Sequence, residues 1–379
     1  MKSFAPLALV TVAAGCALAL GACIVDLSNL SGGEPDPDGG DPSGSTTSGA
    51  GGSTGSGCVG SALDCSGCAC ADGGCDVVPL ATGSDADGPR GIAVSSDGVF
   101  WVDKGGGRIM GFLAQGTAPQ LIVKANAPTT LAVASGRITY VAQDGLWTCL
   151  LPSCDATRSH LAGSIAPGSV QSVAYDGQLV YWADRGDNVN TGNGAIWRCD
   201  PTTDCSAPTL IANQLLNAQG LFLTEDALFW MAQGNGQSNG SIHKSPRNGP
   251  GQMDLAAALV LPTGLAADAT YVYWTEATMS GAVLRCDHTL GYCTTPDNVA
   301  PKAGALGLPL DLALAGGRLY WNENAKGTLS SCPLPGCAAA EDPRVHAAGR
   351  TGVRRLAVGS SCLFWTDEVN GGTVDKVGR

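Results

Sequence analysis

One pair of strands repeats seven times along the chain, and this repeat limits the possible folds more than any other feature. Each unit has a short apolar strand, a turn and a second apolar strand that usually carries an aromatic residue followed by Trp. From Trp101 to Trp365 is 264 residues in six steps, a mean spacing of 44. The second unit has Tyr140 where the others have Trp. The second strands are expected at 99–103, 138–142, 180–184, 228–232, 272–276, 319–323 and 363–367.

Two more short apolar strands follow in the units, for example at 195–199 and 209–212. Four short strands every 40–50 residues are typical of a β-propeller blade. A blade cannot bury both of its faces alone, so blades must stack around an axis. The aromatic–Trp pairs are expected in the gaps between them. The fold class is therefore predicted to be all-β.

The number of blades follows from the strands available at the two ends. The last unit, from about 352 to 379, has room for only three strands. The segment 76–81 can supply the missing outer strand and so join the two ends of the folded region. We therefore predict a seven-bladed propeller over residues 76–379. A six-bladed ring with one stray unit is the alternative, and it would leave an exposed sheet edge.

Two of the second strands carry a specific motif. The segments Tyr273-Trp274-Thr275-Glu276 and Phe364-Trp365-Thr366-Asp367 resemble the YWTD propeller repeats of the low-density-lipoprotein-receptor family. The overall pattern is also similar to uncharacterised lipid-anchored propeller lipoproteins of high-GC, myxobacteria-like bacteria. The resemblance covers about 76–379 and implies extracellular binding, but it supplies no ligand-binding residues. It departs from the family in blade number, since YWTD propellers usually have six.

The first residues are predicted to be a lipoprotein signal peptide, 1–22. Lys2 precedes an apolar run from Leu7 to Leu20, as in secretory signals. The run ends in Leu20-Gly21-Ala22-Cys23, which resembles a bacterial lipobox, so Cys23 is the expected lipidation site. An ordinary signal peptide with a chance cysteine is the alternative. Acyl chains at ~0.8 kcal/mol per buried CH₂ would anchor the protein firmly. The expected location is the bacterial envelope, most simply the outer membrane, with the side left open.

Residues 23–57 are predicted to be a disordered tether rich in Gly, Ser, Asp and Pro. A flexible linker of this length spans some ~30 Å. The segment 58–75 holds five cysteines and is expected to form disulfides, with zinc as the alternative. No other segment is apolar for long enough to cross a membrane, so the lipid anchor is the expected membrane contact.

The remaining cysteines orient the predicted ring. Four local pairs each bracket the turn between the third and fourth strands of a blade: Cys149 with Cys154, Cys199 with Cys205, Cys286 with Cys293, and Cys332 with Cys337. Cys362 lies at a first-to-second turn, which is on the same face of a propeller as the third-to-fourth turns. We expect Cys362 to pair with Cys75 or Cys70. The tether would then leave from this face, and the opposite face would point away from the membrane.

The opposite face holds the candidate ligand-binding residues. Seven of them come just before the inner strands, around the channel mouth: Arg90, Thr129, Gln171, Gln219, Thr263, Leu310 and Arg354. Two long loops, 184–194 and 232–240, add amide and carboxylate side chains: Asp184, Asp187, Asn188, Asn190, Asn193, Gln233, Asn235, Gln237 and Asn239. Amides can bind sugars or peptide backbones, and the two Arg can attract an anionic ligand. Ordinary turns, or a calcium ion at 184–193, are the alternatives.

The net charge and the motifs of the sequence argue against some classes of function. A formal net charge of −12 and a pI near 4.6 argue against nucleic acid as a partner. The four His are scattered, at 160, 243, 288 and 346, and form no recognisable triad or metal motif, so no catalytic residue, metal or cofactor is predicted. We expect a monomeric binding propeller with a protein or glycan ligand. A propeller enzyme, lactonase-like or lyase-like, is the alternative.

Overall fold

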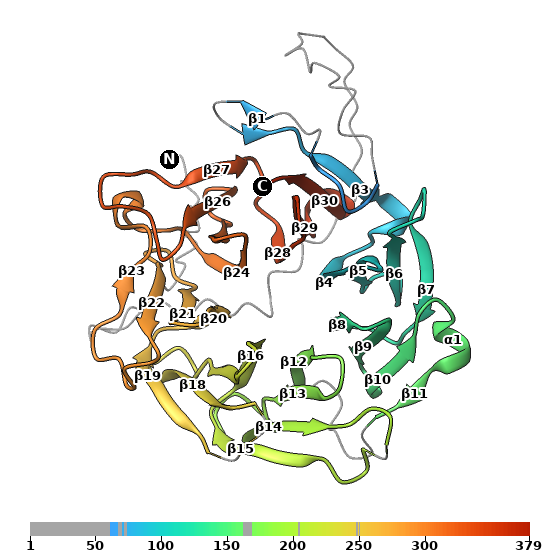
Figure 1. Ribbon diagram of the computed structural model, residues 1–379, viewed down its shortest axis with the longest axis horizontal. Coiled ribbons are helices and arrows are strands. Elements are labelled where there is room, and N and C mark those ends of the chain that lie inside the picture. The colour runs from blue at the N-terminus through green and yellow to red at the C-terminus, as the bar shows by residue number, and fades with distance from the viewer. Residues whose placement is uncertain are drawn as a thin grey trace, which may run out of the picture. The chain divides into compact units, whose positions relative to one another are not determined.

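The computed structural model describes residues 61–66, 70–71, 74–161, 169–203, 205–247, 249 and 251–379. Seven four-stranded antiparallel sheets make up most of this part, and they are arranged as blades around a central opening (Figure 1). The inner strands of successive blades contact one another all the way round, including the first and the last. The prediction of a seven-bladed propeller is confirmed, and the six-bladed alternative is wrong. The expected signal peptide, Cys23 and the tether lie outside the described residues.

The first three blades follow the chain order from inner to outer strand. Blade 1 has β4 (Pro89–Ser95), β5 (Gly98–Asp103), β6 (Arg108–Leu113) and β7 (Gln120–Lys124). Blade 2 has β8 (Thr130–Ala134), β9 (Arg137–Ala142), β10 (Gly145–Leu150) and β11 (Ser159–His160). Blade 3 has β12 (Val170–Tyr175), β13 (Val180–Asp184), β14 (Gly194–Cys199) and β15 (Thr209–Leu215).

The next three blades repeat this order. Blade 4 has β16 (Ala218–Leu223), β17 (Ala227–Ala232), β18 (Gly240–Pro246) and β19 (Met253–Leu259). Blade 5 has β20 (Pro262–Ala267), β21 (Tyr271–Glu276), β22 (Val283–Asp287) and β23 (Asp297–Asn298). Blade 6 has β24 (Pro309–Ala315), β25 (Arg318–Glu323), β26 (Thr328–Pro333) and β27 (Arg344–Ala347).

Blade 7 is built from both ends of the folded region. Its inner strands are β28 (Val353–Val358), β29 (Cys362–Asp367) and β30 (Thr373–Gly378), and its outer strand is β3 (Val78–Thr82). Strand β3 pairs antiparallel with β30, with Val78 opposite Lys376 and Thr82 opposite Thr373. Figure 1 shows the blue β3 lying beside the dark red β30. This pairing leaves no blade with a missing strand.

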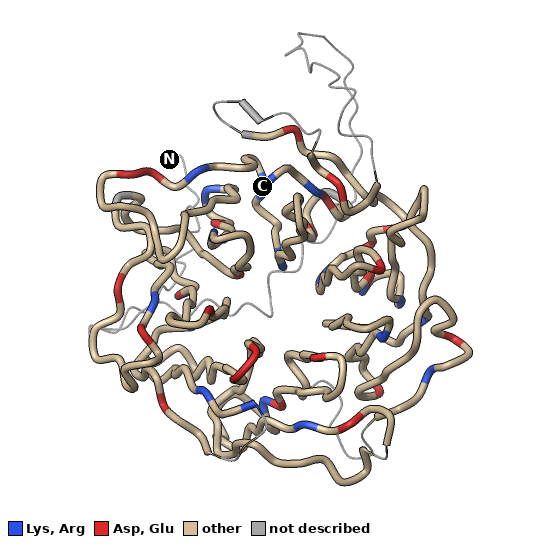
Figure 2. The backbone as a smooth tube through the Cα atoms, in the orientation of Figure 1, with Lys and Arg blue, Asp and Glu red and all other residues tan. Residues whose placement is uncertain are grey.

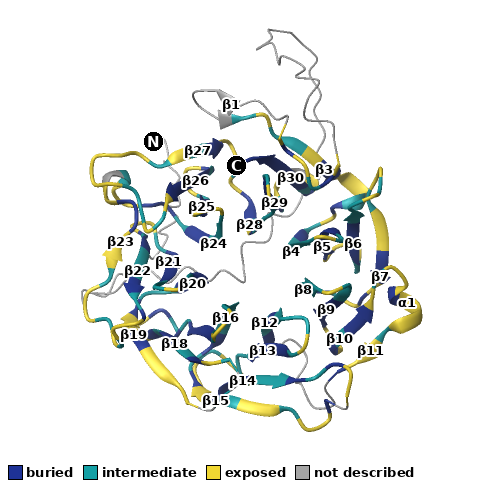
Figure 3. Ribbon diagram, viewed as in Figure 1, coloured by how far each residue is buried: buried dark blue, intermediate teal, exposed yellow. Residues whose placement is uncertain are grey.

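The aromatic–Trp pairs fill the gaps between blades, as the sequence predicts. Successive residues of a strand point to opposite faces, so each pair contributes to two gaps. Trp101 packs with Phe364 of the preceding blade, and Trp230 packs with Tyr181. In the second blade Tyr140 takes the place of Trp and packs against Phe100. These side chains are at most 1% exposed, while the outermost strands are largely solvent-exposed (Figure 3).

Helix is scarce in the described residues. It comprises α1 (Cys154–Thr157) and the short 3₁₀ turns η2 (Gly83–Asp85), η3 (Pro301–Ala303) and η4 (Val369–Gly371). Two further short strands, β1 (Cys70–Ala71) and β2 (Gly74–Cys75), form a separate hairpin. Among the described residues, no helix has the length and hydropathy needed to cross a membrane.

Five disulfides between cysteines of the described residues gather on one face of the ring, which we call the disulfide face. Four of them close turns between a third and a fourth strand, and they are the four predicted local pairs: Cys149 with Cys154, Cys199 with Cys205, Cys286 with Cys293, and Cys332 with Cys337. The fifth joins Cys362 to Cys65. Disulfides of this number indicate an extracytoplasmic location.

The second cysteine of three local pairs lies in a loop before the outer strand and not in a strand. Cys205 is buried, and its Sγ lies 3.2 Å from the Asp200 carbonyl oxygen of the same turn. Cys293 and Cys337 are only half-buried. Each donates its backbone N–H to the preceding blade, to the carbonyl oxygens of Leu255 and Val299 at 2.7 and 2.9 Å. These cysteines therefore brace turns and neighbouring blades.

The predicted partners of Cys362, Cys75 and Cys70, are wrong, because Cys65 takes that position. Cys75 is itself disulfide-bonded. Its backbone pairs with that of Cys70 in the β1–β2 hairpin. Cys75 is therefore part of the β1–β2 hairpin and is not the partner of Cys362. Its proximity to β3 in the sequence, which favoured it over Cys65, does not decide the pairing.

The segment 61–66 explains why Cys65 reaches Cys362. The Lys376 ammonium donates hydrogen bonds to the carbonyl oxygens of Ser61 and Asp64, at 3.0 and 2.9 Å. The Ser361 hydroxyl accepts the Cys65 N–H at 3.0 Å. Ala62 and Cys65 are buried against the closing blade. The chain therefore crosses the disulfide face before it enters β3.

Candidate functional site

The opposite face, which we call the mouth face, carries the loops between second and third strands and the entries to the inner strands. Six inner strands contribute to a central cavity of about 290 Å³. Its polar lining comes from Thr130, Gln171, Ser172, Gln219, Thr263, Asp311 and Arg355. Apolar side chains, mostly Leu with Ala313, Phe222 and Val358, line the rest together with Gly220. The cavity therefore has a polar ring above an apolar wall, which is the usual composition of a small ligand site.

The inner strands approach closely because small residues lie at the same position in several blades. An ideal Cβ on Gly91 would lie 2.9 Å from the Cα of Thr130, and one on Gly264 would lie 2.9 Å from the N of Leu312. In two other blades a side chain at this position bonds to the next blade. Ser172 Oγ accepts the Leu221 N–H at 3.3 Å, and Asp311 Oδ2 accepts the Leu356 N–H at 2.8 Å.

A group of charged side chains lies in and beside the cavity, on blades 6, 7 and 1. We call it the mouth cluster: Arg90, Lys104, Arg354, Arg355, Asp311 and Glu368. Glu368 follows β29 directly, and its carboxylate contacts two guanidinium groups. Arg90 Nε lies 2.7 Å from Oε1, and Arg354 Nε lies 2.5 Å from Oε2. Figure 2 shows Lys and Arg positions on β28 and β4 at the inner edge of the ring.

The mouth cluster carries more positive than negative charge. The positive charge of Arg90 is the main reason that the pKa of Lys104 is lowered, so these two cations lie close together. Arg355 Nη1 lies 3.9 Å from Asp311 Oδ1. Burial raises the pKa of Asp311, although Arg355 acts in the opposite direction. The six residues therefore comprise four cations and two carboxylates, and the buried Asp367 is a further carboxylate near Arg354. Asp311 already accepts a backbone hydrogen bond.

An amide group lies on the other side of the mouth. Gln219 Nε2 donates to Gln233 Oε1 at 2.9 Å and lies 3.1 Å from Asn217 Oδ1. Asn217 Nδ2 also donates to Gln233 Oε1, at 3.0 Å. These three side chains hold one another in place where β16 begins and β17 ends. A carboxamide that is already positioned by its neighbours presents its remaining donors and acceptors at low entropic cost.

The structure brings some of the predicted ligand residues together and separates others. Gln171 and Gln219 line the cavity, and Arg90 and Arg354 lie beside it in the mouth cluster. Asp184, Asp187 and Asn188 instead belong to the 184–194 loop, away from the cavity lining. Their oxygens brace that loop: they accept from Gly186 N, Asn193 Nδ2 and Asn190 N at 2.7–2.9 Å.

The sequence predicts only Arg90 and Arg354 of the six residues of the mouth cluster, and the other four are seen only in the structure. Asp311 and Arg355 lie one residue after the predicted mouth positions, and Glu368 lies in a loop after a second strand. Asp311 and Arg355 could have been found by aligning the seven inner strands with one another. At their position the other blades have small or polar residues, such as Gly91 and Gly264, and no apolar side chain. Glu368 has no such signal, because only the closure of the ring brings it to Arg90. Lys104 follows β5 and comes close to Arg90 through the pairing of β4 with β5.

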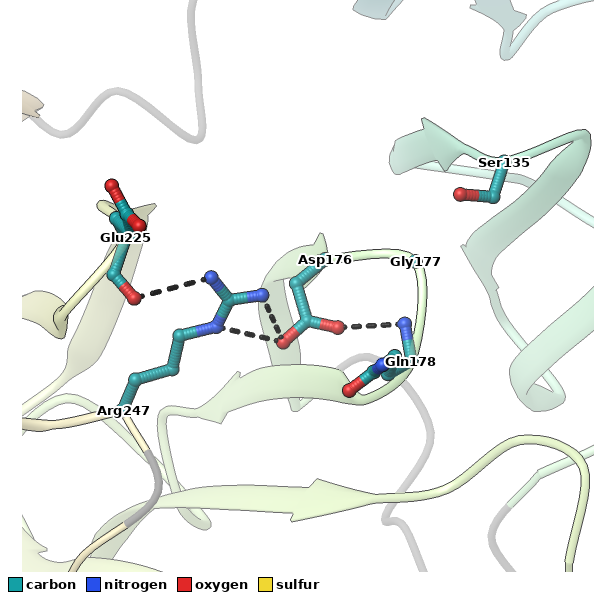
Figure 4. Close-up of a pocket in the computed structure, with 6 residues that line it drawn as sticks. All are labelled: Ser135, Asp176, Gly177, Gln178, Glu225 and Arg247. Carbon is teal, nitrogen blue, oxygen red and sulfur yellow. Dashed lines mark hydrogen bonds and ion pairs between the residues drawn. The ribbon is translucent and has the colours of Figure 1, made fainter.

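A second pocket, of about 460 Å³, lies on the disulfide face (Figure 4). Two of its charged side chains are paired, because Arg247 Nη2 lies 2.7 Å from Asp176 Oδ2 and thereby joins blades 3 and 4. Burial raises the pKa of Asp176, but the Leu179 and Gln178 N–H groups and Arg247 together bring it below its ordinary value. This pocket is best explained as a structural clamp, and the mouth is the better candidate for ligand binding.

The described residues offer no metal centre, because no group of three or more His, Cys, Asp or Glu in that part of the chain could hold an ion. His243, which no sequence motif placed in a triad, hydrogen-bonds to both a serine and an aspartate. Ser241 and His243 share one face of β18, and Asp254 lies opposite His243 on β19.

Comparison with known proteins agrees with the fold. No family model and no curated protein matches this chain. A structure of Kuenenia stuttgartiensis hydrazine synthase is similar, with a TM-score of 0.60 and 13% identity over 78% of this chain and 96% of that one. The computationally designed Ika8 protein has a TM-score of 0.52 and 14% sequence identity, over 79% of this chain and 99% of that one. A chain from a nidogen/laminin complex has a TM-score of 0.47 and 14% sequence identity, over 70% of this chain and 95% of that one. Such identities concern the fold alone.

Proposed function

We propose that this protein is a lipid-anchored binding propeller of a bacterial envelope, and that its mouth face recognises an anionic ligand. The chain would be a monomer held by Cys23, similar to lipoproteins of myxobacteria-like bacteria with YWTD-like repeats. The outer membrane is the proposed site of anchoring. The single observation that carries the proposal is the mouth cluster, in which two guanidinium groups share one carboxylate beside a polar cavity.

The charge of the mouth cluster supports an anionic ligand. The whole chain has a net charge of −12, yet the cluster has four cations against two carboxylates. The Arg90 side chain is 41% exposed, so a ligand can reach it. A guanidinium forms strong, directional hydrogen bonds with carboxylate, sulfate or phosphate groups. A ligand carboxylate could take the place of Glu368 between the two Arg side chains.

The amides beside the cavity support a sugar as the carrier of that charge. Gln171 and Gln219 line the cavity, and the Gln219, Gln233 and Asn217 carboxamides form one hydrogen-bonded group. Sugar hydroxyls both donate and accept hydrogen bonds, and so do carboxamides. We therefore propose an acidic oligosaccharide as the ligand, with an acidic peptide as the other outcome of the test.

The position of the N-terminal segment supports the proposed orientation. Residues 61–66 lie on the disulfide face, and Lys376 and the Cys65–Cys362 disulfide hold them there. A tether that precedes this segment would attach the ring by its disulfide face. The mouth face would then point away from the lipid.

Binding of trigalacturonate, measured by isothermal titration calorimetry, tests the proposed ligand class. We expect the wild-type protein to bind it, and a neutral galactotriose to bind at least ten-fold more weakly. Replacing Arg90 and Arg354 together by Gln removes two charge-assisted contacts and should weaken binding at least about ten-fold. Arg137→Gln, on the disulfide face, is the matched control and should change nothing. An acidic peptide that binds while trigalacturonate does not would contradict the sugar assignment.

Lipidation of Cys23 has a separate test. Expression in a bacterium fed a clickable palmitate analogue should label the wild-type protein and move it to the membrane fraction, because acylation supplies the anchor. Cys23→Ala should abolish the label. Cys16→Ala, inside the apolar run, is the matched control and should retain the label. Equal labelling of the Cys23→Ala variant would show that this cysteine is not the lipidation site.

A further inference from the structure

Beyond ligand binding, we propose that Ser241 is an activated nucleophile that accepts acyl groups from small carboxylic esters. It lies at the start of β18, directly after the 232–240 loop, and it is partly exposed. Its hydroxyl is 2.7 Å from His243 Nε2. His243 Nδ1 is in turn 2.8 Å from Asp254 Oδ1. A nucleophile, a base and a carboxylate that orients the base are thus joined in one chain of hydrogen bonds.

The local sheet structure explains this arrangement. Ser241 and His243 are two residues apart on one strand, so their side chains point to the same face. Asp254 is opposite His243 in the β18–β19 pairing. Trp230, on the neighbouring strand β17, stacks on the imidazole with ring centroids 5.6 Å apart. Gln252 Nε2 also donates to Asp254 Oδ1, at 3.0 Å. The imidazole and the carboxylate are therefore both held in position.

The proton positions follow from the same contacts. With a proton on Nδ1, His243 donates to Asp254, and Nε2 is left to accept the Ser241 hydroxyl hydrogen. Burial lowers the pKa of His243 despite the opposing effect of Asp254. The imidazole is therefore neutral near pH 7 and can act as a base. Its side chain is only 7% exposed, which limits competition by water.

The proposed reaction is an acyl transfer to the serine. Ser241 Oγ forms a bond to the carbonyl carbon of the ester while its proton passes to His243 Nε2. The bond between that carbon and the alcohol oxygen then breaks, and the alcohol leaves with the proton from Nε2. The products are an acyl ester on Ser241 and the free alcohol. Attack by water through the same relay would release the acid and restore the serine.

A second Ser–His pair in the chain provides an internal comparison. Ser331 Oγ lies 2.8 Å from His346 Nε2, but His346 Nδ1 faces the Gly378 carbonyl oxygen at 3.3 Å. Both Ser331 and His346 are fully buried. This pair has the same serine–imidazole contact without a carboxylate or exposure to solvent. We therefore expect Ser331 to be unreactive.

The test is covalent labelling of the folded protein by a fluorophosphonate probe, followed by intact-mass and peptide analysis. In this reaction Ser241 Oγ replaces fluoride on phosphorus. We expect one adduct, on Ser241, and none on Ser331. Ser241→Ala should remove the adduct, and Asp254→Asn should slow its formation at least about ten-fold. Asp254 is 62% exposed, so this variant should keep the fold, which its melting temperature would verify.

Ser245→Ala provides the matched control. Ser245 is on the same strand and is buried, so this variant should be labelled at the wild-type rate. Absence of any adduct on the folded wild-type protein would overturn the proposal. An unchanged rate in the Asp254→Asn variant would also overturn it, because it would show that the relay does not activate the serine. Neither result would bear on ligand binding at the mouth.

Discussion

Replacing Cys65 and Cys362 together by Ala is expected to lower the free energy of unfolding by about 4–5 kcal/mol. The disulfide joins residues 297 positions apart, so its loss frees nearly the whole propeller chain in the unfolded state. In the chain-entropy description, the stabilisation grows with the length of the closed loop. Urea unfolding followed by Trp fluorescence would measure the change, because six buried Trp side chains report on the gaps between blades.

The matched control is the double substitution of Cys149 and Cys154 by Ala. These residues are only five positions apart and are also buried, so the loss of sulfur packing is similar. The expected cost is about 2 kcal/mol, since the closed loop is short. A cost for this local pair equal to or larger than that for Cys65 and Cys362 would contradict the role assigned to the long-range disulfide.

Leu80→Asp is expected to destabilise the protein by at least about 3 kcal/mol, or to prevent folding. Leu80 lies on the buried face of β3 and packs in a cluster with Trp101, Phe364 and Val374. A carboxylate at this position would lose its hydration without gaining a partner, and the apolar contacts would also be lost. A detached β3 would leave the edge of β30 open to pairing with another molecule. Urea unfolding and size-exclusion chromatography would measure both effects.

Thr82→Asp is the control on the same strand. Thr82 is exposed, so the same new charge should cost less than about 0.5 kcal/mol. Equal effects of the two substitutions would mean that β3 does not pack on the closing blade. That result would contradict the assignment of β3 as the outer strand of blade 7.

The sequence predicts the blades because their signals are local. An aromatic–Trp pair on each second strand fills two gaps, and so it recurs at each blade. The four short-range disulfides are equally local, since their cysteines are five to seven positions apart. What the spacing could not predict is the contact of Cys293 and Cys337 with the preceding blade, which depends on how the blades stack. The closure by residues 76–81 could be predicted, because the last repeat unit has only three strands and this segment is the strand left over at the other end.

The partner of Cys362 could not be predicted in the same way. Its choice depends on the path of residues 61–66, which Lys376 fixes through two carbonyl groups. Cys75 is close in sequence to β3, but it belongs to the β1–β2 hairpin and has a disulfide of its own. No spacing rule distinguishes these possibilities, because the contacts that decide between them are more than 300 residues apart.

The residues of the candidate sites also differ in whether the sequence alone could identify them. Gln171 and Gln219 could be found because they precede inner strands, whereas Glu368 reaches Arg90 only through closure of the ring. The Ser241, His243 and Asp254 relay depends on the cross-strand register of β18 and β19, which includes two irregularities. A shift of one residue would turn Asp254 to the other face. Such a contact is a property of the folded sheet and not of the sequence pattern.

Amide hydrogen exchange, followed by mass spectrometry, tests the closed seven-bladed ring most directly, and the positions of the mouth and the tether both depend on this closure. Peptides covering 76–82 and 373–378 should exchange slowly and should lose protection together as urea is added, because β3 and β30 share one ladder of hydrogen bonds. Rapid exchange over 76–82, while the other blades stay protected, would contradict the closed ring.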